Sequence, residues 1–377
     1  MNSIAKNKYN IPVDRIQGLI EKAIEKDILP GAVVLVSHCG QTIFEGAFGM
    51  ADIEKGRRQN VDDLFFLGST SKPLATSSIL TLIEDGKLEL YNPAGNWIPE
   101  YNKAVLKNKK SVRSPIIREM LSHTSGIFGN SKATKTQKQM LWNFNLNLAK
   151  TAAQISRQPL IYPPGEGFSY GGASMTVTGR IVELITKMEF DRFAHEALFT
   201  KLGMHDTFYR TKMNCNDRIS VLYSNTGSGL KKARFQPNAR PGSLVLPPGS
   251  IISTAHDLSS FINIHLHNGK HKKTQILSND LIVEMRKDAT YGNPMDFKTN
   301  NNQQSTVNNE GYGLGWILND LDTSRNARVF FHGGAFGTLI WGDIKTRLGI
   351  ILLTHTPYTQ VAQLWDDVIT IIRESGE

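Results

Sequence analysis

Apolar residues follow helical and strand-like patterns at the two ends of the chain. Residues 13–24 place isoleucine, leucine and alanine at helical spacing and stop before Pro30-Gly31, which predicts a helix. Two short β-rich runs then flank Cys39-Gly40-Gln41, a pattern typical of a hairpin. Residues 328–356 contain three strand-like runs, and residues 358–374 follow as an amphipathic helix. Both ends are therefore predicted to combine a helix with antiparallel strands.

The middle of the chain has helical spacing in four further stretches bounded by Gly or Pro, at about 115–122, 174–187, 191–202 and 255–268. We therefore expect an α+β fold: one antiparallel β-sheet built from both chain ends, flanked by the N- and C-terminal helices, plus an all-helical lobe. A single domain over 12–375 would hold a sheet lobe (about 12–85 and 305–375) and a helical lobe (about 86–304) with a cleft between them. The Asn-rich run 293–311 is predicted to be a mobile surface loop.

Composition narrows the possible classes of protein. The 377 residues carry 43 Lys and Arg against 34 Asp and Glu, a net charge of +9. The densest basic cluster, Asn102 to Arg113, lacks interleaved aromatics, so we expect a solvated surface and no nucleic-acid partner. No apolar run reaches the roughly 18 residues of a membrane span. Cys39 and Cys215 fit neither a disulfide framework nor a C-x-x-C site, and we expect both to be buried.

The stretch "LGSTSKPLAT" places Ser69 and Lys72 three residues apart. Pro73 is tolerated only in the first turn of a helix, which places the helix start near Ser69, and Gly86 predicts its end. Residues three apart share one helix face, so the hydroxyl and the amine can meet. Free amides at the helix start also point toward any developing anion.

Lys72 could act as a base only if its pKa fell from about 10.4 to about 7 or 8, at a cost of roughly 3 to 5 kcal/mol. The spacing alone is weak evidence, because Ser3/Lys6 and Ser228/Lys231 match the same S-x-x-K pattern. An N-cap serine beside a surface lysine therefore stays open as the alternative interpretation.

Two other groups of residues resemble known functional motifs. "GFSYG" around Ser169 matches the G-x-S-x-G nucleophile elbow, but the prolines and glycines of the preceding "YPPGEG" exclude the buried strand that an elbow requires. His265, His267 and His271 lie at spacings that put them on different faces, and Gly269 ends the helix between them. We therefore expect Ser169 not to be the nucleophile and no metal to be bound.

The S-x-x-K motif is accompanied by further stretches that resemble the serine β-lactamase superfamily, and most closely its branch of class C β-lactamases, D-alanyl-D-alanine carboxypeptidases and family VIII carboxylesterases. The resemblance runs from about Leu29 to the C-terminal helix. It rests on "LPGAVVLV" (29–36), "LFFLGSTSKPLATSSILTLIEDGKLEL" (64–90), "IREMLSHTSGI" (117–127), "YPPGEGFSYGGASMTVTGRIVELI" (162–185), "LGMHDTFY" (202–209), "PPGSIISTAHDLSSFI" (247–262), "GYGLGW" (311–316) and "FHGGAFGTLIWGD" (331–343).

The resemblance implies a β-lactamase/transpeptidase-like fold and a role for each matching residue. Ser69 would be the nucleophile, and Lys72 and Tyr170 would move protons, with the ammonium helping to hold Tyr170 as a phenolate. The third motif falls on His332-Gly333-Gly334, where His332 would line the cleft and orient the polar end of the substrate, and Gly333 and Gly334 would let backbone approach it. The oxyanion hole would be the backbone amides of Ser69 and Ala335.

Two departures from the family pattern favour an esterase. Gly172 replaces the asparagine that helps β-lactamases and peptidases hold the acyl-side amide. The lysine of K-T-G is replaced by His332, which would be only partly charged at neutral pH and would anchor a carboxylate less firmly. We therefore expect a carboxylesterase acting on short acyl esters. A D-alanyl-D-alanine carboxypeptidase or D-aminopeptidase, a weak β-lactamase, and a catalytically silent binding protein stay open.

The expected partners follow from this chemistry. The substrate would be a small ester or acyl-peptide, and neither a metal nor an organic cofactor is required. The N-terminus shows no signal-peptide pattern, so the chain as written predicts a cytoplasmic protein, or a periplasmic or secreted one if the terminus is processed. The sequence leaves the oligomeric state and the acyl and leaving groups open.

Overall fold

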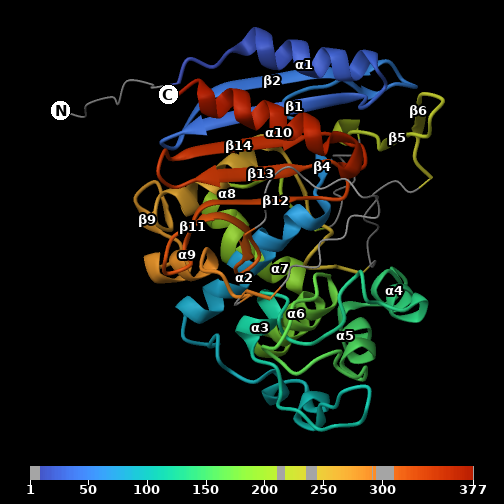
Figure 1. Cartoon of the computed structure of the whole chain (residues 1–377), viewed down its shortest axis with the longest axis vertical. Helices are drawn as coiled ribbons and strands as arrows, with labels where there is room; N and C mark the ends of the chain where they lie inside the picture. Colours follow the sequence, from blue (N-terminus) through green and yellow to red (C-terminus); the bar gives the residue numbers. More distant parts are fainter. Residues whose placement is uncertain (1–8, 210–216, 235–243, 291, 294–309, 377) are drawn as a thin grey trace.

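The computed structural model describes residues 9–209, 217–234, 244–290, 292–293 and 310–376. Its central element is an eight-stranded antiparallel sheet (Figure 1) in the order β10-β11-β12-β13-β14-β1-β2-β3. The strands are β1 (Gly31–His38), β2 (Gln41–Asp52), β3 (Arg57–Arg58), β10 (Gly311–Tyr312), β11 (Ile317–Leu321), β12 (Ala327–Gly333), β13 (Leu339–Asp343) and β14 (Leu348–Leu353). Because β1 pairs with β14, both chain ends share one sheet, which confirms the predicted α+β class.

The strands β1 and β14 lie side by side near the middle of the sheet, and both of their faces are buried. Val33 and Leu35 of β1 belong to the core on one face, and Val34 and Val36 to the core on the other. Side chains alternate along a strand, so a strand buried on both faces needs a continuous apolar run. Burial of each such aliphatic side chain contributes roughly 1.5 to 3 kcal/mol to the stability of the fold.

Helices cover both faces of the sheet. The terminal helices α1 (Val13–Glu25) and α10 (Tyr358–Glu374) pack together with the core of Val34 and Val36, whereas α8 (Ala255–Leu266) packs on the opposite face (Figure 1). The indole nitrogen of Trp365 in α10 donates to the carbonyl of Gly337 at 2.8 Å, which fixes the turn between β12 and β13. The helices predicted at both chain ends are confirmed within one residue.

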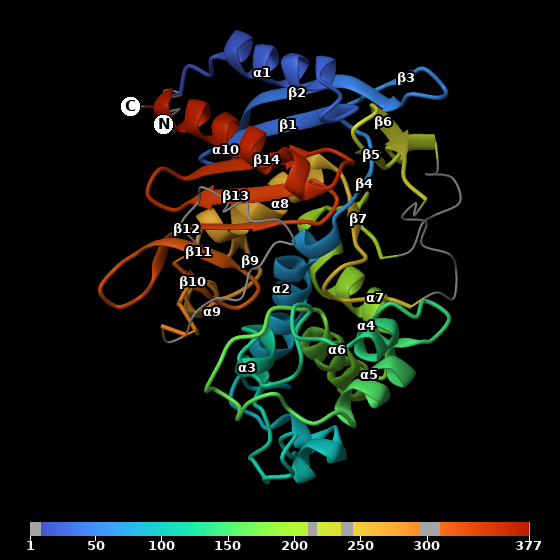
Figure 2. The same cartoon turned by 45° about the vertical axis from the view of Figure 1, so that its right-hand side comes forward.

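The remaining helices lie below the sheet in Figure 2, where α2 runs from the sheet toward α3 and α6. They are α2 (Ser71–Glu84), α3 (Ile117–Leu121), α4 (Lys135–Leu141), α5 (Leu148–Ser156), α6 (Ala173–Thr186), α7 (Phe190–Ala194) and α9 (Asn279–Met285). The helix predicted at 191–202 is α7 followed by a π turn and a 3₁₀ turn, and α4, α5 and α9 were not predicted. The division into two lobes stays a prediction; α8, from the segment assigned to the helical lobe, packs on the sheet.

Helix α2 is buried almost all round rather than along one stripe. Every residue from Ser71 to Leu82 is buried, including its serines and threonines. Two of these hydroxyls are satisfied by the helix itself, since Ser78 donates to the carbonyl of Leu74 at 2.9 Å and Thr81 to that of Ser78 at 2.7 Å. Small hydroxyl residues can therefore line a helix that passes between two packed layers.

Three short two-stranded pairs complete the fold: β4 (Phe65–Phe66) with β7 (Ile252–Ser253), β5 (Tyr223–Asn225) with β6 (Leu230–Lys232), and β8 (Lys270–His271) with β9 (Thr274–Gln275). Ser228 and Lys231 lie in the β5–β6 hairpin and not on a helix, while Ser3 and Lys6 are outside the described residues. No helix in the described ranges is long and apolar enough to cross a membrane.

The structure tests the predicted burial of Cys39 but not the predictions for Cys215 and the Asn-rich run. Cys39 is exposed, so its predicted burial is wrong. The reason is local, because Cys39 occupies the tight β1–β2 turn with φ +50°. Cys215 lies outside the described residues, as does nearly all of the predicted loop at 293–311.

Candidate active site

Ser69 lies in a 3₁₀ turn, Gly68–Thr70, that leads directly into α2. Gly68 has φ +56°, and a Cβ there would lie 3.0 Å from the backbone nitrogen of Ala335, so glycine is required. The preceding strand β4 is fixed by its pairing with β7. Ser69 is partly exposed while its neighbours are buried, so its hydroxyl is accessible at the start of a rigid helix.

Lys72 is directed at Ser69. Its Nζ donates to Ser69 Oγ at 2.8 Å and lies 3.5 Å from the carbonyl of Pro248. The lysine is only 2 % exposed, and burial lowers its pKa to about 7. The alternative of a surface lysine is therefore excluded, and Lys72 can accept a proton near neutral pH.

Tyr170 contacts both Lys72 and Ser69. Its ring centroid is 4.5 Å from Lys72 Nζ, and its hydroxyl hydrogen-bonds to Ser69. Burial raises the pKa of Tyr170 above its usual 10, although the Ser69 contact works against that shift. The expectation of a resting phenolate is thus wrong, because desolvation of the hydroxyl dominates and the ammonium lies over the ring.

The loop that carries Tyr170 is held by backbone hydrogen bonds. The Tyr170 carbonyl accepts from the amide of Asn130 at 2.7 Å. Ser169 is buried, and its hydroxyl accepts from the amide of Gly129 at 3.0 Å. No strand directly precedes Ser169 and its side chain is buried, so the residue supports its loop and lacks the strand and the exposed hydroxyl of an elbow nucleophile.

His332, near the end of β12, is buried and neutral. Its Nδ1 lies 2.8 Å from the carbonyl of Gly333, and since a carbonyl only accepts, Nδ1 carries the proton. Its Nε2 then accepts from the hydroxyl of Tyr312 at 3.3 Å. Burial, with the charge of Lys72, lowers the pKa of His332 to about 3. The expected partial charge at neutral pH is therefore wrong, and both ring nitrogens are already bonded within the protein.

The turn after β12 packs against the residues that precede Ser69. A Cβ on Gly334 would lie 1.9 Å from the carbonyl oxygen of Leu67, and Thr338 Oγ1 donates to that oxygen at 2.7 Å. Thr70 and Thr338 share a hydroxyl hydrogen bond of 2.9 Å. This packing brings the exposed Ala335 beside Gly68, so the predicted amides of Ser69 and Ala335 lie in neighbouring segments.

The three glycines predicted at the substrate site, Gly172, Gly333 and Gly334, are closely surrounded. A Cβ on Gly172 would lie 3.3 Å from Leu141 Cδ2 and 3.4 Å from Pro248 Cγ. A Cβ on Gly333 would lie 2.8 Å from Tyr358 Cε2. Space beside Gly172 is therefore limited by an apolar side chain of α4.

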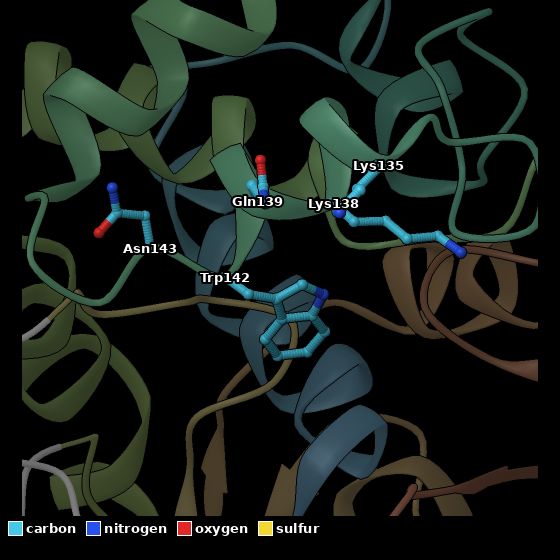
Figure 3. A pocket seen from close by; sticks show the side chains of 5 residues that line it. All are labelled: Lys135, Lys138, Gln139, Trp142 and Asn143. Atoms are coloured by element: carbon cyan, nitrogen blue, oxygen red, sulfur yellow. The ribbon is translucent and has the colours of Figure 1, made fainter.

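A separate cavity of about 890 Å³ lies along α4 (Figure 3). It is lined by Lys135, Lys138, Gln139, Trp142 and Asn143. None of the four residues predicted to do chemistry is among them. Trp142 is half exposed and directly follows Leu141, so one face of this segment borders the cavity and the other contacts the position of Gly172.

The histidines considered for a metal are dispersed. His265 is buried and lies 3.4 Å from Ser77 Oγ, and His267 Nδ1 lies 2.8 Å from the carbonyl of Asn263. His271 belongs to the short strand β8. Within the described ranges, no group of three His, Cys, Asp or Glu side chains could hold a metal ion.

Two residues beside the site were not singled out from the sequence. They are His123 and Tyr312. The ring centroid of His123 lies 4.9 Å from that of Tyr312 and 4.9 Å from that of Tyr170. Both occur in stretches that carry the family resemblance, "IREMLSHTSGI" and "GYGLGW". Their proximity to Tyr170 depends on packing between segments almost 190 residues apart, which no local pattern reveals.

The antiparallel sheet with terminal helices on one face, and the Ser-x-x-Lys pair at the start of a buried helix, together define a β-lactamase/transpeptidase-like protein. The chain belongs to the Beta-lactamase family, which it matches over residues 16–373.

Relatives and solved structures agree with this assignment. The chain is 26% identical over 343 residues to Protein Rv1367c of Mycobacterium tuberculosis (strain ATCC 25618 / H37Rv), covering 87% of this chain and 84% of that protein. It is 25% identical over 378 residues to Esterase EstB of Burkholderia gladioli, covering 91% and 90%. It resembles the structure of EstCE1, a hydrolase with promiscuous acyltransferase activity, with a TM-score of 0.79 at 20% identity over 97% and 98% of the two chains. The last likeness shows the fold.

Proposed function

We propose that this protein is a serine hydrolase that forms an acyl-enzyme on Ser69. The observation that carries the proposal is the 2.8 Å contact between Ser69 Oγ and a buried Lys72 whose pKa is lowered to about 7. A neutral amine at this distance can take the hydroxyl proton as the oxygen attacks a carbonyl. The 3.0 Å approach between Ala335 N and a Cβ placed on Gly68 supports an oxyanion hole formed by the amides of Ser69 and Ala335.

Tyr170 would complete the proton transfers as a neutral phenol. When the tetrahedral intermediate collapses, the bond to the leaving oxygen breaks and that oxygen must receive a proton. The Tyr170 hydroxyl, bonded to Ser69, can donate it and recover a proton from Lys72. Water then attacks the acyl-enzyme, gives up a proton by the reverse route, and releases the acid and free Ser69.

We infer that the substrate is a short acyl ester. Gly172 has no side-chain amide to bind an acyl-side peptide group, and Leu141 presents an apolar surface beside that position. His332 is neutral, so the site lacks the cation that would attract a β-lactam or peptide carboxylate there. The similarity to Esterase EstB supports the same choice.

The test is turnover of three substrates in parallel: a short p-nitrophenyl ester, a cephalosporin and a D-Ala-D-Ala peptide. We expect the ester to be hydrolysed with the highest kcat/KM. Labelling by a fluorophosphonate, read as a mass increase, reports the reactive serine independently of substrate. A wild-type protein that neither hydrolyses any of the three nor takes up the label is a binding protein, which contradicts the proposal.

A further inference from the structure

His123 occupies a backbone position that normally belongs to glycine. Helix α3 ends with Ser122 as its cap, and the amide of Thr124 donates back to the carbonyl of Glu119 at 2.9 Å. This bond is the one that closes a helix end through a left-handed residue, and His123 is that residue, with φ +61°. A side chain in this conformation costs stability, so the backbone gives no reason for a histidine here.

Among the residues that the structure describes, none forms a hydrogen bond with the imidazole that would offset this cost. His123 is 2 % exposed, and neither ring nitrogen has a hydrogen-bond partner in the described part of the chain. A buried polar group without a partner is destabilising. Burial also lowers the pKa of His123 well below its usual range, so the ring is neutral.

What the ring does have is aromatic contacts around Tyr170. Its centroid is 4.9 Å from those of Tyr170 and Tyr312 and 6.0 Å from that of Phe168. The backbone is tied to the same loop, because the His123 carbonyl accepts from the amide of Ser169 at 2.9 Å. His123 therefore holds the residue before Tyr170 through its backbone and the Tyr170 ring through its own ring.

We propose that His123 is a positioning residue for Tyr170. Its ring forms, with that of Tyr312, the wall against which the Tyr170 ring rests, and thereby keeps that ring beneath Lys72 and its hydroxyl at Ser69. The strained backbone and the unbonded nitrogens indicate that stability was given up to place a compact ring here. The inference rests on the proposed hydrolase function, because it assigns His123 a role in the proton transfers of that site.

Substitutions at His123 can distinguish the effect of the ring on activity from the effect of its nitrogens and from a general loss of stability. His123→Asn and His123→Gly both tolerate the left-handed backbone and remove the ring. His123→Phe keeps an aromatic ring and removes the nitrogens. His265→Asn is the matched control, since His265 is also buried with an unbonded Nδ1 among aromatic rings, but packs in the core around Phe261 and Trp316.

Two readouts are measured for each variant: kcat and KM for a p-nitrophenyl ester, and the rate of fluorophosphonate labelling of Ser69. We expect His123→Asn and His123→Gly to lower kcat and the labelling rate by about tenfold or more with KM within about threefold, and His123→Phe to stay within about threefold of wild type. His265→Asn should lower Tm and leave both rates unchanged in the folded protein.

Wild-type rates in both ring-less variants would overturn the inference while leaving the proposed function intact. Loss in His123→Phe equal to that in His123→Asn would also overturn it, because the nitrogens and not the ring would then be needed. If His123→Asn does not fold, His123→Gly decides the case. An inactive, unlabelled wild type contradicts the proposed function itself.

Discussion

Lys72 Nζ lies 4.5 Å from the centre of the Tyr170 ring, and burial is the main cause of the pKa shift of both residues. An aromatic face attracts an ammonium with about 2 kcal/mol when both are desolvated. Burial destabilises the ammonium form, because lowering the lysine pKa from 10.5 to about 7 corresponds to roughly 5 kcal/mol. The larger effect wins, so the amine titrates near neutral pH while the tyrosine keeps its proton.

The pH dependence of the reaction follows from this balance. Below pH 7 Lys72 is protonated and cannot accept the Ser69 proton, so kcat/KM should rise with pH, reach half its maximum near the lysine pKa of about 7 and level off above it. His332, with a pKa of about 3, should contribute no further step between about pH 5 and 9. A profile that falls with rising pH across this window would rule out the amine as the base.

Mutation can show which of the two serines in nucleophile-like motifs, Ser69 or Ser169, is the nucleophile. Ser69→Ala should lower ester hydrolysis by a factor on the order of 10⁴ or more, because no nucleophile is left. Ser169→Ala removes only the acceptor for the Gly129 amide and should keep most of the activity per folded molecule. Initial rates on a p-nitrophenyl ester decide the matter, and the opposite ranking would assign the chemistry to Ser169.

The role of the phenol can be isolated from the role of the ring. Tyr170→Phe keeps the aromatic face under Lys72 and removes the proton donor, so kcat should fall by about 10² to 10⁴ while the lysine pKa stays near neutral. Tyr101→Phe is the control, because the Tyr101 hydroxyl is also buried and has no partner among the described residues. The comparison uses kcat and the pH midpoint; a Tyr170→Phe enzyme as fast as Tyr101→Phe would remove Tyr170 from the mechanism.

Lys72 should also reduce the stability of the folded protein. Its pKa is about 7 when folded and 10.5 when exposed, so between these values the unfolded chain binds more protons and stability rises with pH. The cost of burial is complete below pH 7 and vanishes above pH 10.5. Lys72→Met should therefore be inactive yet more stable than wild type by roughly 3 to 5 kcal/mol at about pH 6, and the gap should close toward about pH 10. Urea unfolding of both proteins across that range measures it, and a constant gap would contradict the shifted pKa.

The sequence predicted the sheet and the terminal helices because their burial requires long, regular patterns. Strand β1 is apolar from Gly31 to Val36, and α10 has an uninterrupted helical stripe, so local periodicity was sufficient. The short helices of the middle were missed for the opposite reason. Helix α4 has seven residues, two of them buried, and its clearest signal is the reciprocal cap between Thr134 and Gln137.

The site shows a similar division. Ser69 and Lys72 lie on one helical turn, so spacing alone could bring them together. The protonation of Tyr170 and His332 could not be predicted correctly, because it depends on burial between chain segments that are distant in sequence. His123 was overlooked because its left-handed backbone and its contact with Tyr170 exist only in the folded chain.

Leu141 offers a test of why the site favours esters. An asparagine at position 172 would put its Cβ 3.3 Å from Leu141 Cδ2, tighter than most such contacts, and its amide would extend further into the same space. Gly172→Asn should therefore lower kcat/KM for a short ester by about tenfold without creating cephalosporin hydrolysis. Adding Leu141→Ala should recover most of the loss, since the two side chains compete for one volume. Gly18→Asn is the matched control, because nothing lies within 4 Å of a Cβ at that position. A double-mutant cycle on wild type, Gly172→Asn, Leu141→Ala and the double mutant gives the coupling. A Gly172→Asn enzyme with full activity, or no recovery in the double mutant, would show that Leu141 does not limit the acyl side of the site.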